Sequence, residues 1–286
     1  YTYGSRKPET THGTIKEDAF RRDLTMNALY QEIWSGNIID PTGCGIHDVM
    51  NKVLMTTSSP DEIFIDDPLR ILRVIRFYLR MDYDWKIEPV VEQALSKYAK
   101  ELVNISSERI VDELRKMFVH PKSCIHSIIR LLQKYGVLEY CMFHSVSPLD
   151  DSSRKMFMKH FQWYYEATPP VLPYIPSAGI SESNKVIRYM SYMLYVMYNM
   201  NPMGSDLVKL IMKPKWPNEI VYGVCKVFEC MHSQTLFMNL DEIQSSDNII
   251  SQLHLLQNQC GNADVYGNLK CLLYAVWNTT PLSKYF

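Results

Sequence analysis

The sequence predicts a mostly α-helical protein, in which a short segment of mixed helix and strand is followed by helices throughout. Two observations lead to this fold class. Strand-forming stretches occur only around a Gly/Pro loop at residues 37–57. Later segments repeat apolar residues at intervals of three and four, which places them on one side of a helix. With 286 residues, 47% of them hydrophobic, the chain is long enough for a sizeable core.

Charge and cysteine content narrow the class of protein. The formal net charge is −1, so an anionic partner must be held by a local basic patch and not by the field of the whole protein. The seven cysteines are scattered without a CxxC spacing, which is typical of free thiols in a reducing compartment. No apolar run reaches the roughly 18–20 residues of a membrane span. We therefore expect an intracellular protein with no membrane segment.

The first helix is expected to begin at residue 14, because Thr14 and Glu17 have the spacing of a capping box. It leads into the stretch "RRDLTMNAL" at residues 21–29. On a helix the two adjacent arginines point to different faces, so at most one of them joins any given site. The strands and loop of residues 37–57 follow.

Polar residues of this first stretch suit a nucleotide. Asp23 and Asn27 are four residues apart and would share a helix face. There they would hydrogen-bond a ribose hydroxyl, while Arg22 holds a triphosphate. When the segment is taken by itself, a capped surface helix with an internal ion pair is the better explanation.

The stretch "DDPLRILRVIRF" at residues 66–77 predicts an amphipathic helix, with Pro68 in its first turn and Asp66 or Asp67 as its cap. On a helical wheel, one side is apolar and the other carries arginines, with Leu69 the one apolar exception. The apolar side consists of Ile71, Leu72, Val74, Ile75, Tyr78 and Leu79, and the arginines are Arg70, Arg73, Arg76 and Arg80. A solvated helix face is the plain alternative for these arginines.

Asp67 and Arg70 place a carboxylate acceptor beside a guanidinium donor at the start of that helix. Cytosine and adenine both present an amino donor next to a ring-nitrogen acceptor, which matches this pair. Uracil and guanine present the reverse order, at a cost of roughly 1–3 kcal/mol for each buried group left unsatisfied. The pair would thus select C and A and reject U and G.

Helices are expected to continue to the end of the chain. The segment 104–118 begins with Ser106 or Ser107 as its cap and buries an apolar stripe of Ile110, Val111, Leu114, Met117 and Phe118. The segment 123–141 is a further helix that Gly136 ends. The Pro-rich segment 168–176 is the clearest linker, and Met190, Met193, Met197 and Met200 beyond it are typical of core filling.

Common catalytic motifs are missing from the sequence. It contains no phosphate-binding Gx4GK[ST] loop, no GxGxxG, no GxSxG elbow and no HExxH. Asp82 and Asp84 have the D-x-D spacing of a metal-binding pair, but they follow the arginine helix without a Gly-rich strand and turn before them. We therefore do not assign them a metal.

Four motifs together resemble the class II tRNA nucleotidyltransferases, which are the CCA-adding enzymes and close relatives of bacterial poly(A) polymerases. The motifs are "GTIKEDAFRRDLTMNAL", "IDPTGCGIHDV", "DDPLRILRVIRF" and "SSERIVDELRKM", in the family's order and at about its spacings. The resemblance covers residues 1 to about 140. Two departures are Asp66, where many bacterial members have Glu, and a "DPTGCGIHD" loop that is one residue longer than their common form.

The resemblance implies a role for each motif. It implies that Arg22, Asp23 and Asn27 recognise ribose and triphosphate, and that Asp67 and Arg70 form an amino-acid template for CTP and ATP. It implies that Arg73 and Arg76 hold phosphates or brace this template, and that Arg109 stabilises the turn around it. It also implies two Mg²⁺ ions bound by paired carboxylates on a Gly-rich strand and turn. We expect that segment to precede Tyr1, so that this chain carries no catalytic residue and is the later part of a longer protein.

The resemblance also implies a domain organisation and a function. Residues 1–58 would be the C-terminal part of an α/β nucleotidyltransferase head, residues 59–143 a helical neck, and residues 144–286 a helical body and tail that binds tRNA. The expected activity is addition of CCA to the 3′ end of tRNA from CTP and ATP, in the cytoplasm, mitochondrion or nucleus. An A-only polymerase and a non-catalytic RNA-binding relative are the alternatives, and the oligomeric state is left open.

Overall fold

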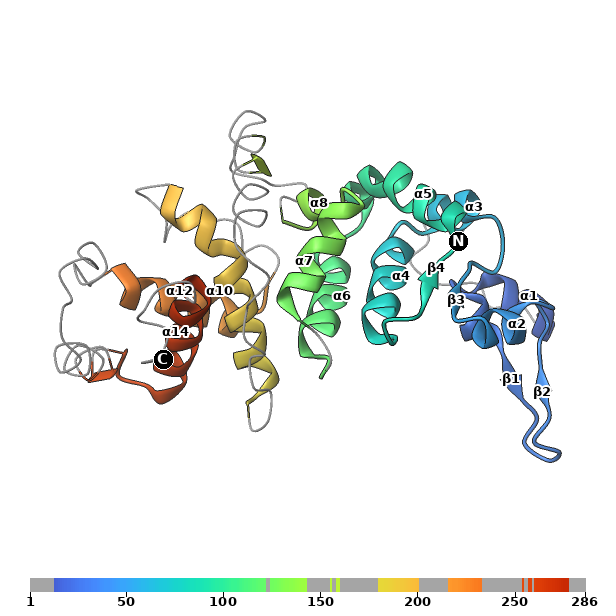
Figure 1. Cartoon of the computed structure of the whole chain (residues 1–286), viewed down its shortest axis with the longest axis horizontal. Helices are drawn as coiled ribbons and strands as arrows, with labels where there is room; N and C mark the ends of the chain where they lie inside the picture. Colours follow the sequence, from blue (N-terminus) through green and yellow to red (C-terminus); the bar gives the residue numbers. More distant parts are fainter. Residues whose placement is uncertain are drawn as a thin grey trace. The chain divides into compact units, whose positions relative to one another are not determined.

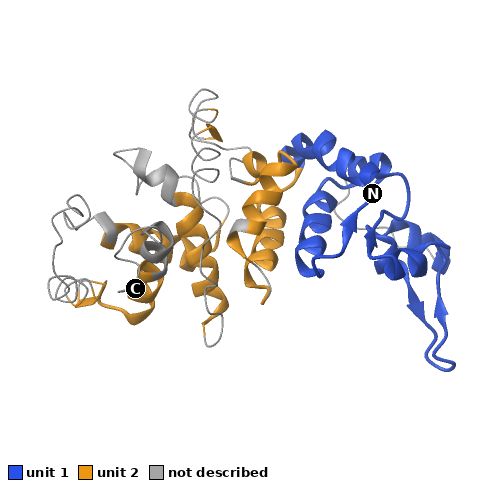
Figure 2. Ribbon diagram, in the orientation of Figure 1, with its two compact units in different colours: residues 1–104 blue, residues 105–286 orange. Residues whose placement is uncertain are grey.

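The computed structural model describes residues 13–121, 124–142, 180–200, 216–232 and 260–277, together with positions 155, 158, 159, 254, 257 and 258. The chain divides into two compact units, Tyr1–Asn104 and Ile105–Phe286 (Figure 2). The mostly helical class is confirmed, since the described residues contain helices and only two sheets of two short strands each. The Pro-rich segment 168–176 lies outside the described residues.

Unit 1 begins with helix α1, which spans Ile15–Arg21. The predicted capping box is confirmed: Glu17 N–H donates to Thr14 Oγ1 over 3.2 Å, and Thr14 N–H donates to Glu17 Oε2 over 2.7 Å. The expectation that the helix continues through Asn27 is wrong. Its cap residue Arg22 is extended, and a separate 3₁₀ helix η1 follows at Thr25–Ala28.

A narrow hairpin and a short helix follow η1 (Figure 1). Strands β1 (Tyr30–Gln31) and β2 (Ile38–Ile39) pair antiparallel, and helix α2 spans Gly45–Met50. The expected Gly/Pro loop after β2 is confirmed, but it leads into a helix that the sequence analysis missed. Asp40 organises this turn, because its carboxylate accepts from the N–H groups of Thr42, Gly43 and Ile46 over 3.1–3.2 Å.

The remaining elements of unit 1 are β3 (Val53–Leu54), α3 (Pro60–Asp66), α4 (Leu69–Arg80), β4 (Lys86–Ile87), α5 (Pro89–Tyr98) and the 3₁₀ helix η2 (Ala99–Asn104). Strands β3 and β4 pair in parallel, so the prediction that everything after residue 57 is helical is wrong at β4. Lys52 forms an ion pair with Asp84 beside this pairing. Helix α3 packs against α4 and α5.

Helix α4 has the predicted apolar side, with Ile71, Leu72, Val74 and Ile75 fully buried. Two details differ from the helical wheel. Leu69 is buried, and Arg76 is only 6% exposed, with its guanidinium 4.6 Å from the ring centre of Phe77. The arginine side of α4 is therefore not a uniformly solvated face, because the surrounding core encloses parts of it.

Unit 2 contains helices α6 (Ser107–Val119), α7 (Ile125–Lys134), α8 (Leu138–Met142), α10 (Glu182–Met200), α12 (Asn218–His232) and α14 (Ala263–Trp277). The predicted apolar stripe of α6 is buried as expected, and Gly136, at φ +67°, separates α7 from α8. Met190 and Met193 are core residues, as predicted.

Helix α10 packs against α6, α12 and α14. It approaches α12 so closely that a Cβ at Gly223 would lie 2.3 Å from Ile187 Cδ1. The buried ammonium of Lys185 donates to the carbonyls of Val119 and His120, over 3.2 and 2.9 Å, and so caps the C-terminal end of α6. Of the helices described, none has both the length and the apolar composition needed to cross a membrane.

Candidate functional site

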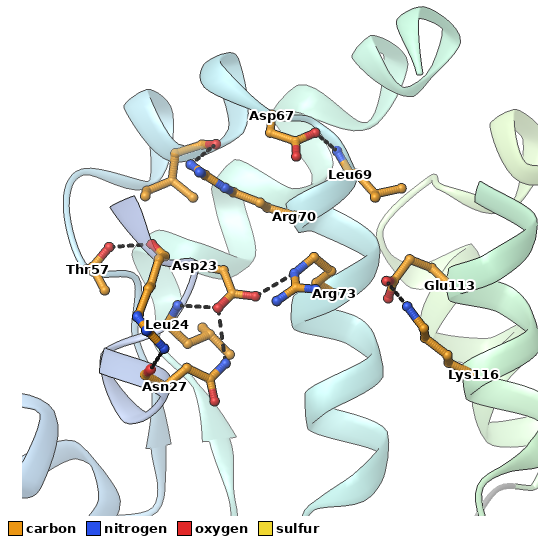
Figure 3. Close-up of polar contacts among 12 residues, drawn as sticks. Asp23, Leu24, Asn27, Thr57, Asp67, Leu69, Arg70, Arg73, Glu113 and Lys116 are labelled. Carbon is orange, nitrogen blue, oxygen red and sulfur yellow. Dashed lines mark hydrogen bonds and ion pairs between the residues drawn. The ribbon is translucent and has the colours of Figure 1, made fainter. Parts of the chain in front are cut away.

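Asp23 lies at the centre of a polar cluster in unit 1 and is almost fully buried (Figure 3). Its Oδ1 accepts from Leu24 N–H and Asn27 Nδ2, each over 3.0 Å, and its Oδ2 accepts from Arg73 Nε over 2.7 Å. Burial alone would raise the pKa of Asp23, but the hydrogen bond from Asn27 and the charge of Arg73 hold that pKa below its usual range. Asp23 thus links η1 to helix α4.

Asp23 and Asn27 do meet, as the sequence analysis expected, although no continuous helix holds them. The Asp23 carboxylate is occupied by groups of the protein itself, whereas Asn27 is half-buried and turns only one N–H toward it. This geometry favours Asn27 as the group that contacts a ribose, with Asp23 orienting it. The ribose role of both residues stays a prediction.

Arg22 lies at the end of α1 with 43% of its side chain exposed. Its Nε and Nη2 donate to Asp18 Oδ2 over 3.1 and 2.9 Å, and its Nη1 donates to the carbonyl of Asn27 over 2.9 Å. The hydrogen bond to Asp18 raises the pKa of Arg22 above its usual value. The guanidinium is therefore charged, accessible and held in one place.

Arg70 projects from the first turn of α4, and only 16% of its side chain is exposed. Its Nη2 donates to the carbonyl of Arg21 over 2.9 Å, and its Nη1 donates to the carbonyl of Ile63 over 3.3 Å. Asp66 lies 3.0 Å from Nη1. Within the described part of the chain, the Nε–H and one N–H of Nη2 make no hydrogen bond, so one edge of the guanidinium remains for a ligand.

Asp67 stands immediately before α4, where its Oδ1 accepts from Leu69 N–H over 3.2 Å (Figure 3). Asp67 thus receives an N–H of the first turn, as a capping side chain does, although the residue directly before the helix is Pro68, which is already in helical conformation. Capping fixes the carboxylate at the helix start, one turn before Arg70. An acceptor and a pair of donors are thus held on neighbouring positions of a rigid element.

The other predicted site residues differ in environment. Arg73 is half-buried and bound to Asp23, and Arg76 is buried, which suits bracing better than direct contact with a phosphate. Arg109 is exposed on the first turn of α6, in unit 2, and its role stays a prediction.

Sequence reasoning missed the main-chain part of this site. Three successive carbonyls at the end of α1 face side-chain donors. Thr57 Oγ1 lies 2.6 Å from the carbonyl oxygen of Arg22 and 3.3 Å from that of Phe20, so its one O–H can donate to either, and Arg70 donates to the carbonyl of Arg21. No side-chain pattern reveals such acceptors, because every residue carries a carbonyl. Asp18 was also missed, although its spacing of four from Arg22 on a helix was a usable signal.

The described residues do not fit a divalent metal. Among them, no three carboxylate, histidine or cysteine side chains lie close enough together to hold one. Asp84 of the D-x-D pair is engaged by Lys52. A metal ion that takes part in the reaction would therefore need ligands other than these residues.

Comparison with protein families identifies two regions. Residues 1–55 match the family described as the poly A polymerase head domain, and residues 84–143 match the probable RNA- and SrmB-binding site of polymerase A.

Curated relatives bear consistent names. The chain is 28% identical over 74% of its length to tRNA nucleotidyltransferase cca1 of Schizosaccharomyces pombe, and 37% identical over 47% to the mitochondrial CCA tRNA nucleotidyltransferase of Saccharomyces cerevisiae. It is 33% identical over 48% to the CCA-adding enzyme of Anoxybacillus flavithermus. It spans 43%, 24% and 33% of these three relatives, which is less than half of each.

Solved structures share the fold. The CCA-adding enzyme of Bacillus stearothermophilus in complex with CTP superposes with a TM-score of 0.60 at 19% identity, over 96% of this chain and 59% of that one. A tRNA nucleotidyltransferase with a primer tRNA and an ATP analogue gives a TM-score of 0.60 at 21% identity, over 96% of this chain and 75% of that one.

Proposed function

The chain is a relative of the CCA-adding and poly(A)-polymerase nucleotidyltransferases, and from this premise we propose that it selects CTP and ATP for addition of CCA to the 3′ end of tRNA. In that reaction the 3′-hydroxyl of tRNA attacks the α-phosphate of the nucleotide, and pyrophosphate leaves. Names and bound molecules of the relatives support tRNA, CTP and ATP as the partners. The division into a head of residues 1–58, a neck of residues 59–143 and a tRNA-binding body and tail of residues 144–286 belongs to the same proposal.

The observation that carries the proposal is the geometry of Arg70. Its position is fixed by two main-chain carbonyls, those of Arg21 and Ile63, so the side chain is ordered before a ligand binds. The two N–H groups on its remaining edge suit the ring nitrogen and carbonyl oxygen of cytosine, or the ring nitrogen of adenine. Asp67 supplies the acceptor that the amino group of either base requires.

The residues assigned to nucleotide binding are those of unit 1: Arg22 for the triphosphate, Asn27 with Asp23 for the ribose, and Asp67 with Arg70 for the base. Arg73 and Arg76 brace this arrangement. For Arg109, on helix α6 of unit 2, the proposal keeps only the expectation that it stabilises a turn. Two divalent metal ions would supply charge stabilisation at the attacking and leaving oxygens. Their carboxylate ligands, like any catalytic residue, are expected outside the described residues. We place the protein inside the cell, in the cytoplasm, mitochondrion or nucleus.

Substitution of Asp67 by asparagine tests the assignment. The asparagine side chain has nearly the same shape, but its amide both donates and accepts, so it discriminates poorly between an amino group and a carbonyl. We expect the preference for CTP over UTP, measured as the ratio of dissociation constants by isothermal titration, to fall about tenfold.

The matched control is Asp61→Asn, the same chemical change on helix α3 at an exposed residue paired with Lys97. It should leave the ratio as it is in the parent chain. Equal ratios for Asp67→Asn and the parent chain would show that Asp67 does not face the base.

A second candidate, an A-only polymerase, is favoured by the family description matched by residues 1–55. Sequencing the products that the full-length protein, with its metal-binding segment, makes on tRNA lacking its CCA end distinguishes the two activities. Incorporation of C before A supports the CCA-adding function, and runs of A alone support the second candidate.

A further inference from the structure

Arg22 is held by two side chains, Asp18 and Tyr30, to which neither the motifs nor the comparisons assign a role. The Oδ2 atom of Asp18 accepts three hydrogen bonds, two from Arg22 and one from the hydroxyl of Tyr30 over 2.5 Å. The guanidinium carbon of Arg22 also lies 5.0 Å from the ring centre of Tyr30, within cation–π range. We call Asp18, Tyr30 and Arg22 the Arg22 cluster.

Three segments of the chain converge on this guanidinium. Asp18 lies on α1, Tyr30 begins strand β1, and the carbonyl of Asn27 belongs to η1. Together they use one N–H each of Nε, Nη1 and Nη2. The hydrogen bonds to Asp18 and to the Asn27 carbonyl leave one N–H on each terminal nitrogen, beside the interaction of the guanidinium with Tyr30. These two N–H groups can donate to a phosphate.

We propose that Asp18 and Tyr30 are positioning residues that fix the direction of the Arg22 guanidinium for the triphosphate of the incoming nucleotide. The proposal rests on the assignment of Arg22 to the triphosphate in the proposed function. Neither residue touches the nucleotide in this account. Each restricts the conformations of the Arg22 side chain before the nucleotide arrives. Less conformational entropy is then lost when the triphosphate binds.

The cluster differs from an ordinary surface ion pair. An isolated exposed Arg–Asp pair samples many geometries and contributes little. Here the aspartate is itself fixed by Tyr30, whose backbone is paired with Ile39 in the β1–β2 hairpin. The hydrogen bonds from Tyr30 and Arg22 lower the pKa of Asp18, and the bond to Asp18 raises the pKa of Tyr30, so both groups keep their charge states around neutral pH.

The test compares the affinities of this chain for CTP and for cytidine, which lacks the phosphates. Tyr30→Phe keeps the ring and removes the hydroxyl, whereas Tyr30→Leu removes both. We expect the CTP-to-cytidine affinity ratio to fall about three- to fivefold in Tyr30→Phe and about tenfold in Tyr30→Leu and Asp18→Asn. The matched control is Tyr83→Phe, at a fully exposed tyrosine of the same unit.

Combining each change with Arg22→Ala separates positioning from a general loss of structure. With Arg22 removed, Tyr30→Phe and Asp18→Asn should have no further effect on the ratio, because the group that they position is gone. A ratio unchanged in Tyr30→Phe, or a further fall in the Arg22→Ala background, overturns the proposal.

A second measurement does not depend on nucleotide binding. In the unliganded chain, the Nε–H of Arg22 should give an NMR signal with slow solvent exchange, which quickens severalfold in Tyr30→Phe and disappears in Asp18→Asn. Fast exchange in the parent chain overturns the proposal whatever the nucleotide data show. If exchange is slow but the chain binds no CTP, Arg22 is held in place as described, and the result contradicts the proposed function.

Discussion

At the scale of single residues, Asp23 shows how a side chain predicted to bind ligand is also tied firmly into the protein. Its carboxylate is buried and receives three hydrogen bonds, one of them from Arg73, fifty positions along the chain. A carboxylate held in this way must be ionised to keep its partners. The residue most conspicuous in the "RRD" stretch is thus a link between two elements, and the half-exposed Arg22 beside it is the better candidate for direct contact.

Asp23→Asn is expected to lower the free energy of unfolding at pH 7 by about 2 kcal/mol, since Arg73 loses a charged partner in a largely enclosed place. The pKa of Asp23 lies below its usual value when folded. Its contribution is therefore complete at neutral pH and is lost as the pH falls through the folded-state pKa. Urea unfolding of both chains should show the full difference at pH 7 and a smaller one at acid pH, below the usual pKa of an aspartate.

Asp61→Asn supplies the comparison for an exposed pair, because Asp61 and Lys97 are both largely solvated. It should change the free energy of unfolding far less than Asp23→Asn at neutral pH. A difference between parent and Asp23→Asn that is the same at pH 7 and at acid pH would contradict the linkage.

At the scale of elements, the turn that Asp40 organises before α2 contains two glycines, Gly43 and Gly45, which are required for different physical reasons. Gly43 has φ +77°, and nothing lies within 4 Å of the position that a Cβ would occupy there. Only its left-handed backbone conformation therefore favours glycine at this position. Gly45 does not have a positive φ, but a Cβ there would lie 2.8 Å from the carbonyl oxygen of Thr25 and 2.9 Å from Leu29 Cδ2. The close approach of α2 to η1 depends on Gly45.

Gly45→Ala should lower the free energy of unfolding by about 1–3 kcal/mol, because the backbone carbonyl of Thr25 cannot move aside as a flexible side chain would. Gly43→Asn is the control, since asparagine tolerates the left-handed conformation. Thermal unfolding followed by circular dichroism measures both. A Gly45→Ala chain as stable as the parent would mean that α2 and η1 separate freely.

At the scale of the whole molecule, the chain divides into two compact units, and each contains buried apolar residues. Hydrogen bonds join the helices within unit 2. One set comes from Lys185 on α10, which donates to the carbonyls at the C-terminal end of α6. Asn268 on α14 joins the same helix α10, by accepting from Arg188 Nε over 2.8 Å and donating to Asn184 over 2.9 Å.

Lys185→Met is expected to lower the stability of unit 2 by about 1–3 kcal/mol, because it leaves two carbonyls at the end of α6 without their donor. Hydrogen exchange should become faster in α6 and α10 and stay unchanged in α4 of unit 1. Lys226→Met, at an exposed pair with Glu229 on α12, is the control. Faster exchange throughout unit 1 would show that the two units do not unfold separately.

Those features that depend on near neighbours along the chain could be predicted from the sequence. The capping box at Thr14, the cap by Asp67 and the apolar stripe of α4 follow from spacings of two to four residues. The burial of Arg76 and the partnership of Asp23 with Arg73 do not, because they depend on which elements pack together. Likewise, the break between α1 and η1 is set by contacts with the segment around Thr57, which no local propensity encodes.

The bond from Arg70 to the carbonyl of Arg21 has a mechanical consequence. Arg21 is joined by a single peptide group to Arg22, so the guanidinium groups of Arg70 and Arg22 are anchored on adjacent links of one stretch of backbone. A displacement of one guanidinium must strain the attachment of the other. If the two side chains serve the base and the phosphates as we propose, an engineered change of base preference is expected to alter the hold on the phosphate tail as well.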